Sequence, residues 1–186
     1  MSIPLQPRDQ RLADQASGAR HQHAQWPRWR MALRRSLVSG TWASLCSSAV
    51  VSWLSHRRAA AVPAGTNATS QWVWGRQAHR KDGWSLRHTL VGYVIHHASS
   101  LFWASSFERL RKGRRDVAPV LALAAATTAV AYVVDYKVVP RRLTPGFETR
   151  LRPADLCVVY AAFGLGLALP WILSRRRMSG TVAKRR

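Results

Sequence analysis

Two adjacent histidines, His96 and His97, lie at the midpoint of a mostly apolar segment over residues 86–107. An imidazole there could bond to a neighbouring helix, ligate a metal or haem, or relay protons. An ionisable group inside a membrane-crossing segment is a functional candidate by default. Because adjacent helical residues point about 100° apart, the two rings cannot readily hold one small ion together, and interhelical hydrogen bonding is favoured. The candidate partners in an earlier apolar segment are Ser44, Ser47 and Ser48.

A carboxylate near the end of another apolar segment is the second candidate. Tyr132, Asp135 and Tyr136 share one helical face at spacings i, i+3 and i+4. Held by these phenols or by His88, the carboxylate could take up a proton or a cation. Pairing of Asp135 with Lys137 or a loop arginine is at least as well supported. His88 itself is best interpreted as an interfacial residue near the lipid headgroups.

Motifs for enzymatic chemistry are missing from the sequence. It has no phosphate loop, GxSxG, HExxH or dinucleotide fingerprint. Cys46 and Cys157 are far apart and form neither a CxxC motif nor a zinc spacing. A haem held between helices needs histidines from facing helices, which one chain does not supply here, although a second copy could. Glu108 suits an ordinary helix-surface pair with Arg111 at i+3. We therefore predict no enzymatic role, no cofactor and no metal.

Four nearly uncharged segments set the architecture: 36–55, 86–107, 117–139 and 154–173. Each has about the 20 residues that a helix needs to cross a bilayer core of roughly 30 Å. The sequence therefore predicts an all-α fold, an integral membrane four-helix bundle.

Small residues at four-residue spacing predict where these helices approach one another closely. On the third segment they form one stripe: Ala118, Ala122, Ala126 and Ala129. On the fourth they form two pairs, Gly164 with Ala168 and Ala162 with Gly166.

The charge pattern indicates a membrane rather than a nucleic-acid partner. The chain has 29 Lys and Arg against 8 Asp and Glu, a net charge of +21, yet 47% of it is hydrophobic. Its basic residues alternate with the apolar spans instead of lining one soluble face. With four spans, 18 basic residues fall on one side and 10 on the other. The positive-inside rule then places both termini in the cytoplasm.

Polar segments flank the spans. Residues 1–35 are predicted to form a disordered basic cytoplasmic arm, and residues 174–186 a basic cytoplasmic tail. No cleavable signal peptide is expected, because a polar stretch precedes the first apolar run. An arginine-rich, acid-poor start also suits a mitochondrial transit peptide. The compact loops and basic tail suit a bacterial inner membrane at least as well.

One set of residues forms a recognisable pattern: Asn67-Ala68, Trp74-Gly75, Ala78, Arg87-His88-Thr89, Gly92, His96-His97, Trp103, Glu108 and the stretch from Pro140 to Glu148. In these residues the chain resembles a family of small multi-pass bacterial inner-membrane proteins without an established activity. The resemblance covers residues 36–173 and implies a four-helix topology. Such proteins are expected to carry a histidine near Gln71. Its absence argues against a loop metal site shared with His88.

Together these patterns predict a non-enzymatic accessory or assembly component, or a small channel-like bundle. Anionic lipid headgroups are the expected partners of its basic rims, and a membrane-protein partner or a homo-oligomer is compatible with the small-residue faces. The alternative is a membrane redox or proton/ion transport component that uses His96, His97 and Asp135.

Overall fold

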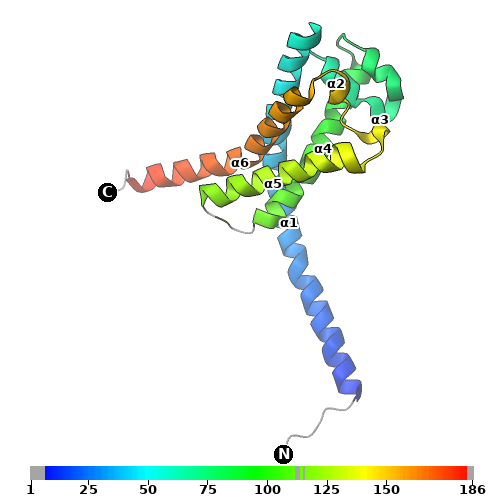
Figure 1. Cartoon of the computed structure of the whole chain (residues 1–186). Coiled ribbons are helices and arrows are strands. Elements are labelled where there is room, and N and C mark those ends of the chain that lie inside the picture. Colours follow the sequence, from blue (N-terminus) through cyan, green and yellow to red (C-terminus); the bar gives the residue numbers. More distant parts are fainter. Residues whose placement is uncertain (1–6, 112–113, 115, 184–186) are drawn as a thin grey trace, which may run out of the picture.

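A computed structural model describes residues 7–111, 114 and 116–183 of the chain (Figure 1). It is 86% helix, and the described residues contain no strand, as the all-α prediction requires. The long helices are α1 (Pro7–Ala59), α4 (Val91–Arg111), α5 (Val117–Val133) and α6 (Pro153–Ala183). The short ones are α2 (Ala64–Thr69), α3 (Gln71–Trp74), η1 (Gly75–Arg80), η2 (Leu86–Leu90), η3 (Val134–Val138), η4 (Arg141–Leu143) and η5 (Phe147–Thr149).

The N-terminal segment differs from the predicted disordered arm. Helix α1 is continuous from Pro7, and its first part extends away from the other helices (Figure 1). Helix α6 likewise runs on to Ala183. From Pro7 onward the predicted disordered arm is therefore helical, because its many Arg, Gln, Ala and Leu residues favour a helix and continue one that the apolar segment starts. Residues 1–6 and 184–186 lie outside the described part.

Three helical segments are long and apolar enough to cross a membrane: Arg30–Ala59, Val117–Val138 and Pro153–Arg175. They contain three of the four predicted spans, apart from the last residue of the third. The segment 86–107 is helical as well, through η2 and α4, but it does not reach the same hydropathy. The structure thus supports a membrane-associated helical protein with three such helices.

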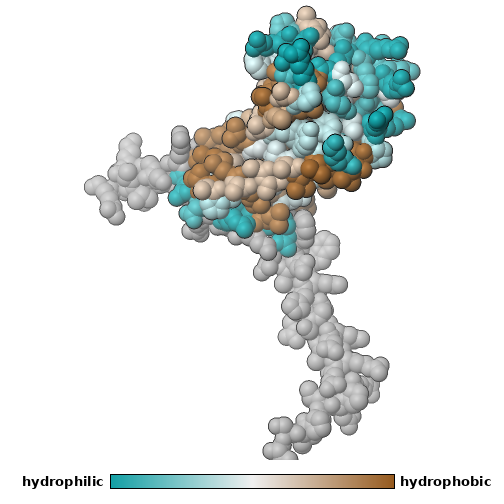
Figure 2. Space-filling model, viewed as in Figure 1, coloured by the Kyte–Doolittle hydropathy of each residue, from teal (hydrophilic) through white to brown (hydrophobic). Residues whose placement is uncertain are grey.

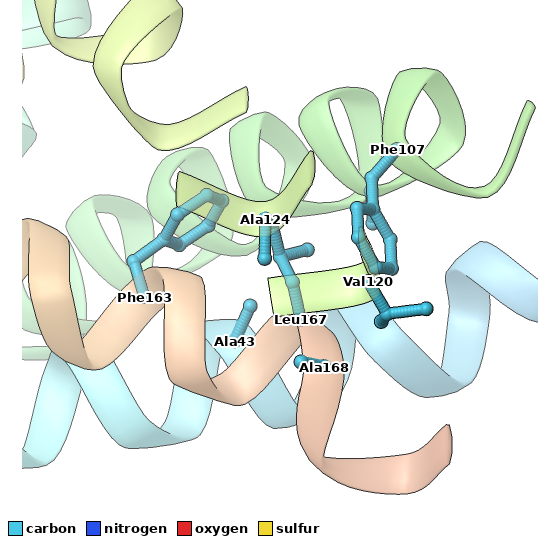
Figure 3. Close-up of a cluster of buried hydrophobic side chains, with 8 residues drawn as sticks. Ala43, Phe107, Val120, Ala124, Phe163, Leu167 and Ala168 are labelled. Atoms are coloured by element: carbon cyan, nitrogen blue, oxygen red, sulfur yellow. The ribbon is translucent and has the colours of Figure 1, made fainter. Parts of the chain in front are cut away.

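Side chains from all four long helices form an apolar core (Figure 3). Its members are Ala43, Ala104, Phe107, Val120, Ala124, Phe163, Leu167 and Ala168. In this core α6 approaches α1 closely, because a Cβ added at Gly166 would lie 2.5 Å from the Cα atom of Ala43. The glycine is therefore required by the packing, as the small-residue pairs of this helix predicted.

Helix α5 packs through a different face from the one predicted. The stripe of Ala118, Ala122, Ala126 and Ala129 is exposed. The inward face instead carries Val120, Ala124, Thr127, Thr128 and Ala131. Since α5 has small residues on all sides, spacing alone could not identify the side that meets α6, where the added Cβ of Gly164 would lie 2.7 Å from the Thr128 hydroxyl.

Helix α4 and η2 have an apolar outer side and a more polar inner side. The exposed residues Leu86, Leu90, Val94 and Phe102 follow one another along the outer side. Ser100 is buried on the inner side. Gly92 brings the start of α4 against α2, since an added Cβ there would lie 2.0 Å from the carbonyl oxygen of Thr66.

The short helices α2, α3, η1, η4 and η5 form what we call the polar cap, over residues 61–85 and 140–152. Figure 2 shows hydrophilic residues gathered at this end and a band of hydrophobic residues across the helices beside it. The sequence predicted two loops here. The structure instead folds them together, with the Trp72 indole donating to the carbonyl of Thr144 at 3.1 Å.

Candidate functional site

A cavity of about 50 Å³ lies between α1, α4, α6, the end of α5 and the polar cap. Its lining includes His96 and Asp135, the two sequence candidates from different helices, together with Ser47 and Tyr160. Trp103 and Phe163 close part of its wall. A space of this size with several polar groups can hold a few water molecules. The fold therefore brings one histidine and the aspartate to a shared polar site.

His96 is fixed by the serine-rich face of α1. Its Nε2 lies 2.9 Å from the Ser47 hydroxyl oxygen, which itself donates to the carbonyl of Ala43 at 2.7 Å. The hydrogen of Ser47 is thus already used, so His96 Nε2 donates and Nδ1 carries the lone pair, as this network assigns the tautomer. The predicted hydrogen bond to a serine of the first span is confirmed.

His97 points elsewhere. Its ring stacks on Tyr93 with centroids 5.8 Å apart, and its buried Nδ1 has no hydrogen-bond partner among the described residues. It does not line the cavity that His96 lines. The two histidines therefore diverge, as their sequence spacing predicted, and do not form one ligand pair.

Asp135 accepts a hydrogen bond from a tyrosine on a helix that the sequence did not suggest. Its Oδ2 accepts a hydrogen bond from the Tyr160 hydroxyl at 2.5 Å. Tyr132 and Tyr136, the expected phenol donors, instead pack their rings against Tyr160 at 5.3 and 6.0 Å. Neither Lys137 nor a loop arginine pairs with the carboxylate in the described part of the chain. Only facing-helix geometry could have identified Tyr160, since periodicity reports neighbours on the same helix.

His88 is a buried residue rather than an interfacial one, with 5% of its surface exposed. Its Nδ1 lies 3.0 Å from the Ser70 hydroxyl, and its ring meets the edge of Trp74. The close approach of α2 to Gly92 covers this side of the helix and removes His88 from the surface. It is not among the residues that line the cavity, so the predicted contact with Asp135 is not formed.

Buried amides hold the polar cap together. Asn67, which is fully buried, donates from Nδ2 to the carbonyls of Lys81 at 2.8 Å and Gly83 at 2.9 Å. Its Oδ1 accepts from the Thr89 hydroxyl at 2.6 Å. Through its two donated bonds and one accepted bond, this side chain thus ties the segment after η1 to η2.

Gln71 lies in the region where the family resemblance led us to expect a histidine. Its Nε2 donates to the carbonyl of Thr144 at 2.8 Å, and its Oε1 accepts from His79 Nε2 at 2.6 Å. Burial lowers the pKa of His79 below its ordinary value, which favours the neutral ring. Sequence reasoning did not select His79, whose role depends on this contact across the cap.

An ion pair joins the end of α1 to the start of α6, beside the polar cap. Arg58 donates to both carboxylate oxygens of Asp155 at 2.9 and 2.8 Å, and Asp155 is buried. The sequence did contain a signal for this pair, since Arg58 and Asp155 have opposite charges and lie at the ends of two predicted spans. The sequence-based predictions did not include the pair. By contrast, the predicted local pair of Glu108 and Arg111 forms, at 3.0 Å, although both residues are buried rather than on the helix surface.

An apolar groove of about 480 Å³ runs beside the cavity, between α4 and the end of α5. It shares Trp72, Trp103 and Asp135 with the cavity and adds the exposed Val94 and Phe102. The polar site thus lies next to the hydrophobic outer surface, whereas the apolar core separates it from the opposite end of the helices.

Within the described ranges, no three His, Cys, Asp or Glu side chains are grouped as a metal ion would require. The described part of the chain is all-helical, with three helices long and apolar enough to cross a membrane. No family model, curated protein or solved structure matches it. The resemblance noted in the sequence therefore stays a prediction.

Proposed function

We propose that the chain is a bacterial inner-membrane protein in which α4 is the fourth span, and that it acts as an accessory or assembly component rather than as an enzyme. The observation that carries this proposal is the polarity of α4. Its exposed side is apolar, with Leu90, Val94 and Phe102, whereas His96 and Ser100 face inward. Mean hydropathy averages the two sides, and so it underestimates how well α4 could cross a membrane.

The length of α4 agrees with this placement. Its 21 residues rise about 32 Å, close to the hydrocarbon thickness of roughly 30 Å. It begins at the polar cap and ends beside the start of the apolar part of α1, where Arg111 and Arg34 line one groove. A helix that connects the same two levels as its neighbours is expected to cross the same layer.

Charge favours a cytoplasmic position for the end opposite the cap. Arginines from three separate parts of the chain gather there, namely Arg34, Arg35, Arg111, Arg114 and Arg175. The start of the span in α1, the loop after α4 and the start of the tail therefore share one level. The positive-inside rule favours the cytoplasm for this richer end, as it does for both termini.

An accessory role is favoured over conduction by the apolar core. Phe107, Val120 and Leu167 are almost fully buried and fill the space between the cavity and the arginine-rich end. Conduction needs a continuous path that water or ions can occupy, and a tightly packed apolar layer interrupts such a path. The helices here enclose a polar pocket beside the cap and a packed apolar core toward the arginine-rich end. This arrangement suits binding and assembly.

Reporter fusions test the topology. We expect C-terminal reporters after residues 113 and 180 to report a cytoplasmic position, and reporters after residues 83 and 146 a periplasmic one. The fusions at 83 and 113 bracket α4 alone. If both report the same side, α4 does not cross the membrane and the four-span proposal fails.

A proton or ion transport function is the second candidate, because the cavity brings His96 and Asp135 together. In that case, replacing Asp135 by Asn should reduce proton flux into liposomes at least tenfold, since the amide keeps the shape but cannot exchange a proton. The matched control is Asp116→Asn, an exposed carboxylate outside the cavity. Flux that is absent in the wild type, or equal in both variants, would exclude this function.

A further inference from the structure

The end of the molecule opposite the polar cap carries a groove of about 810 Å³ between α1, α4 and α6. Its charged lining consists of Arg34, Arg35, Glu108, Arg111, Arg114 and Arg175. Five guanidinium groups and one carboxylate give the groove a formal charge of +4. Arginines that contacted only water could lie anywhere on the surface, whereas these gather in one groove from three helices and the loop after α4. We infer that this groove binds the headgroup of an anionic phospholipid that carries two phosphates.

The single carboxylate does not oppose an anion there. Glu108 Oε2 accepts from Arg111 Nε at 3.1 Å and from Nη2 at 3.0 Å, and both residues are buried. Its charge is therefore neutralised locally. The remaining positive charge belongs to exposed arginines that can reach phosphate oxygens, and guanidinium groups suit bidentate bonding to phosphate.

The groove also has an apolar side, which favours a lipid over a free anion. Val38, Pro170 and Trp171 contribute to its lining. The Arg175 guanidinium lies over the Trp171 ring, 5.8 Å from its centroid, which orients the charge beside an aromatic surface. Basic pockets between membrane helices on the cytoplasmic side are suited to lipid headgroups. A headgroup would meet the arginines while its glycerol and upper acyl chains meet the apolar lining.

Two phosphates fit the charge better than one. A single phosphodiester would compensate one of the four net charges, and a pair of phosphates would compensate two. The arginines also lie on α1, on α4, in the loop after α4 and on α6, so they line the groove from several sides. The inference rests on the proposed cytoplasmic position of this end of the bundle, which the reporter fusions test separately.

Lipid binding can be measured directly on the full chain purified in neutral detergent. We would titrate it with cardiolipin, with phosphatidylglycerol and with inorganic diphosphate, and count bound molecules by native mass spectrometry. Cardiolipin is expected to bind at one site per chain and more tightly than phosphatidylglycerol. Inorganic diphosphate is expected to bind far more weakly, because it lacks the apolar contacts.

The test variant is Arg35→Gln with Arg175→Gln, which removes one charge from α1 and one from α6. We expect it to weaken cardiolipin binding about 30-fold, the size expected for two well-placed arginines. The matched control is Arg76→Gln with Arg80→Gln, two exposed arginines of the polar cap, and it should change affinity less than twofold. If the first pair prevents folding, Arg34→Gln with Arg114→Gln provides the same test.

Three results would overturn the inference. Equal cardiolipin affinity in the groove and cap variants would show that the groove is not the site. Equal wild-type affinity for phosphatidylglycerol and cardiolipin would exclude recognition of two phosphates. Diphosphate binding as tight as that of the lipid would indicate a site for a soluble anion. Failure of these tests with correct reporter topology would leave the four-span proposal intact.

Discussion

Replacement of Asn67 by aspartate is expected to lower the free energy of unfolding by about 3 kcal/mol, because a buried carboxylate would replace an amide that donates to two carbonyl groups. The Nδ2 group donates to the carbonyls of Lys81 and Gly83 from a fully buried position. An ionised carboxylate has nearly the same shape, but it would face these two carbonyl oxygens without a hydrogen to share. Chemical denaturation in detergent micelles, followed by tryptophan fluorescence, measures the change.

The control for this substitution is Gln77→Glu, an equal change of charge at an exposed position of the polar cap. We expect it to alter stability by less than about 0.5 kcal/mol. Lowering the pH should partly restore the Asn67→Asp variant, because a protonated carboxyl group regains one donor. A variant as stable as the wild type at neutral pH would show that the network around Asn67 does not determine the stability of the cap.

Replacement of Gly166 by leucine should separate α6 from α1 and cost about 3 kcal/mol through overpacking. The added Cβ would lie 2.5 Å from the Cα of Ala43 and 2.8 Å from the carbonyl oxygen of Trp42. These are backbone atoms, so no side-chain rotation can relieve the clash. The loss should appear as a lower unfolding temperature and as aggregation of the purified protein.

Two variants of the same helix calibrate this result. Ala161→Leu adds a similar side chain on the exposed side of α6 and should leave the unfolding temperature nearly unchanged. Gly164→Ala should have an intermediate effect, because its added Cβ meets the Thr128 hydroxyl, which can rotate away. Equal losses at Ala161 and Gly166 would mean that the observed contact between α6 and α1 does not control stability.

The sequence predicted the apolar helices well and the polar cap poorly. Three long apolar helices coincide with predicted segments because an uncharged run of about 20 residues is a direct signal of length and solvation. The polar cap was missed as a folded unit. Its order comes from side-chain amides such as Asn67 and Gln71 that bond to carbonyls far along the chain, and no local period records such contacts.

The candidate site was predictable in its members but not in their pairing. His96 and Asp135 stand out in sequence because ionisable groups are rare in apolar segments. Spacing on one helix, however, predicted Tyr132 and Tyr136 as hydrogen-bond donors to Asp135, whereas the donor is the Tyr160 hydroxyl on α6. The exposed face of α5 illustrates the same limit, since an alanine-rich helix offers several equivalent small-residue stripes.

The uneven polarity of α4 bears on how a membrane-embedded chain would be assembled during synthesis. Alone in lipid, this helix would expose His96 and Ser100 to hydrocarbon, which is costly for polar groups. Helix α1 is made earlier and carries Ser47, the partner of His96. Helix α4 is therefore expected to leave the insertion machinery beside α1, as the second half of a helical hairpin. The order of the helices along the chain would then also be the order in which they can enter the bilayer.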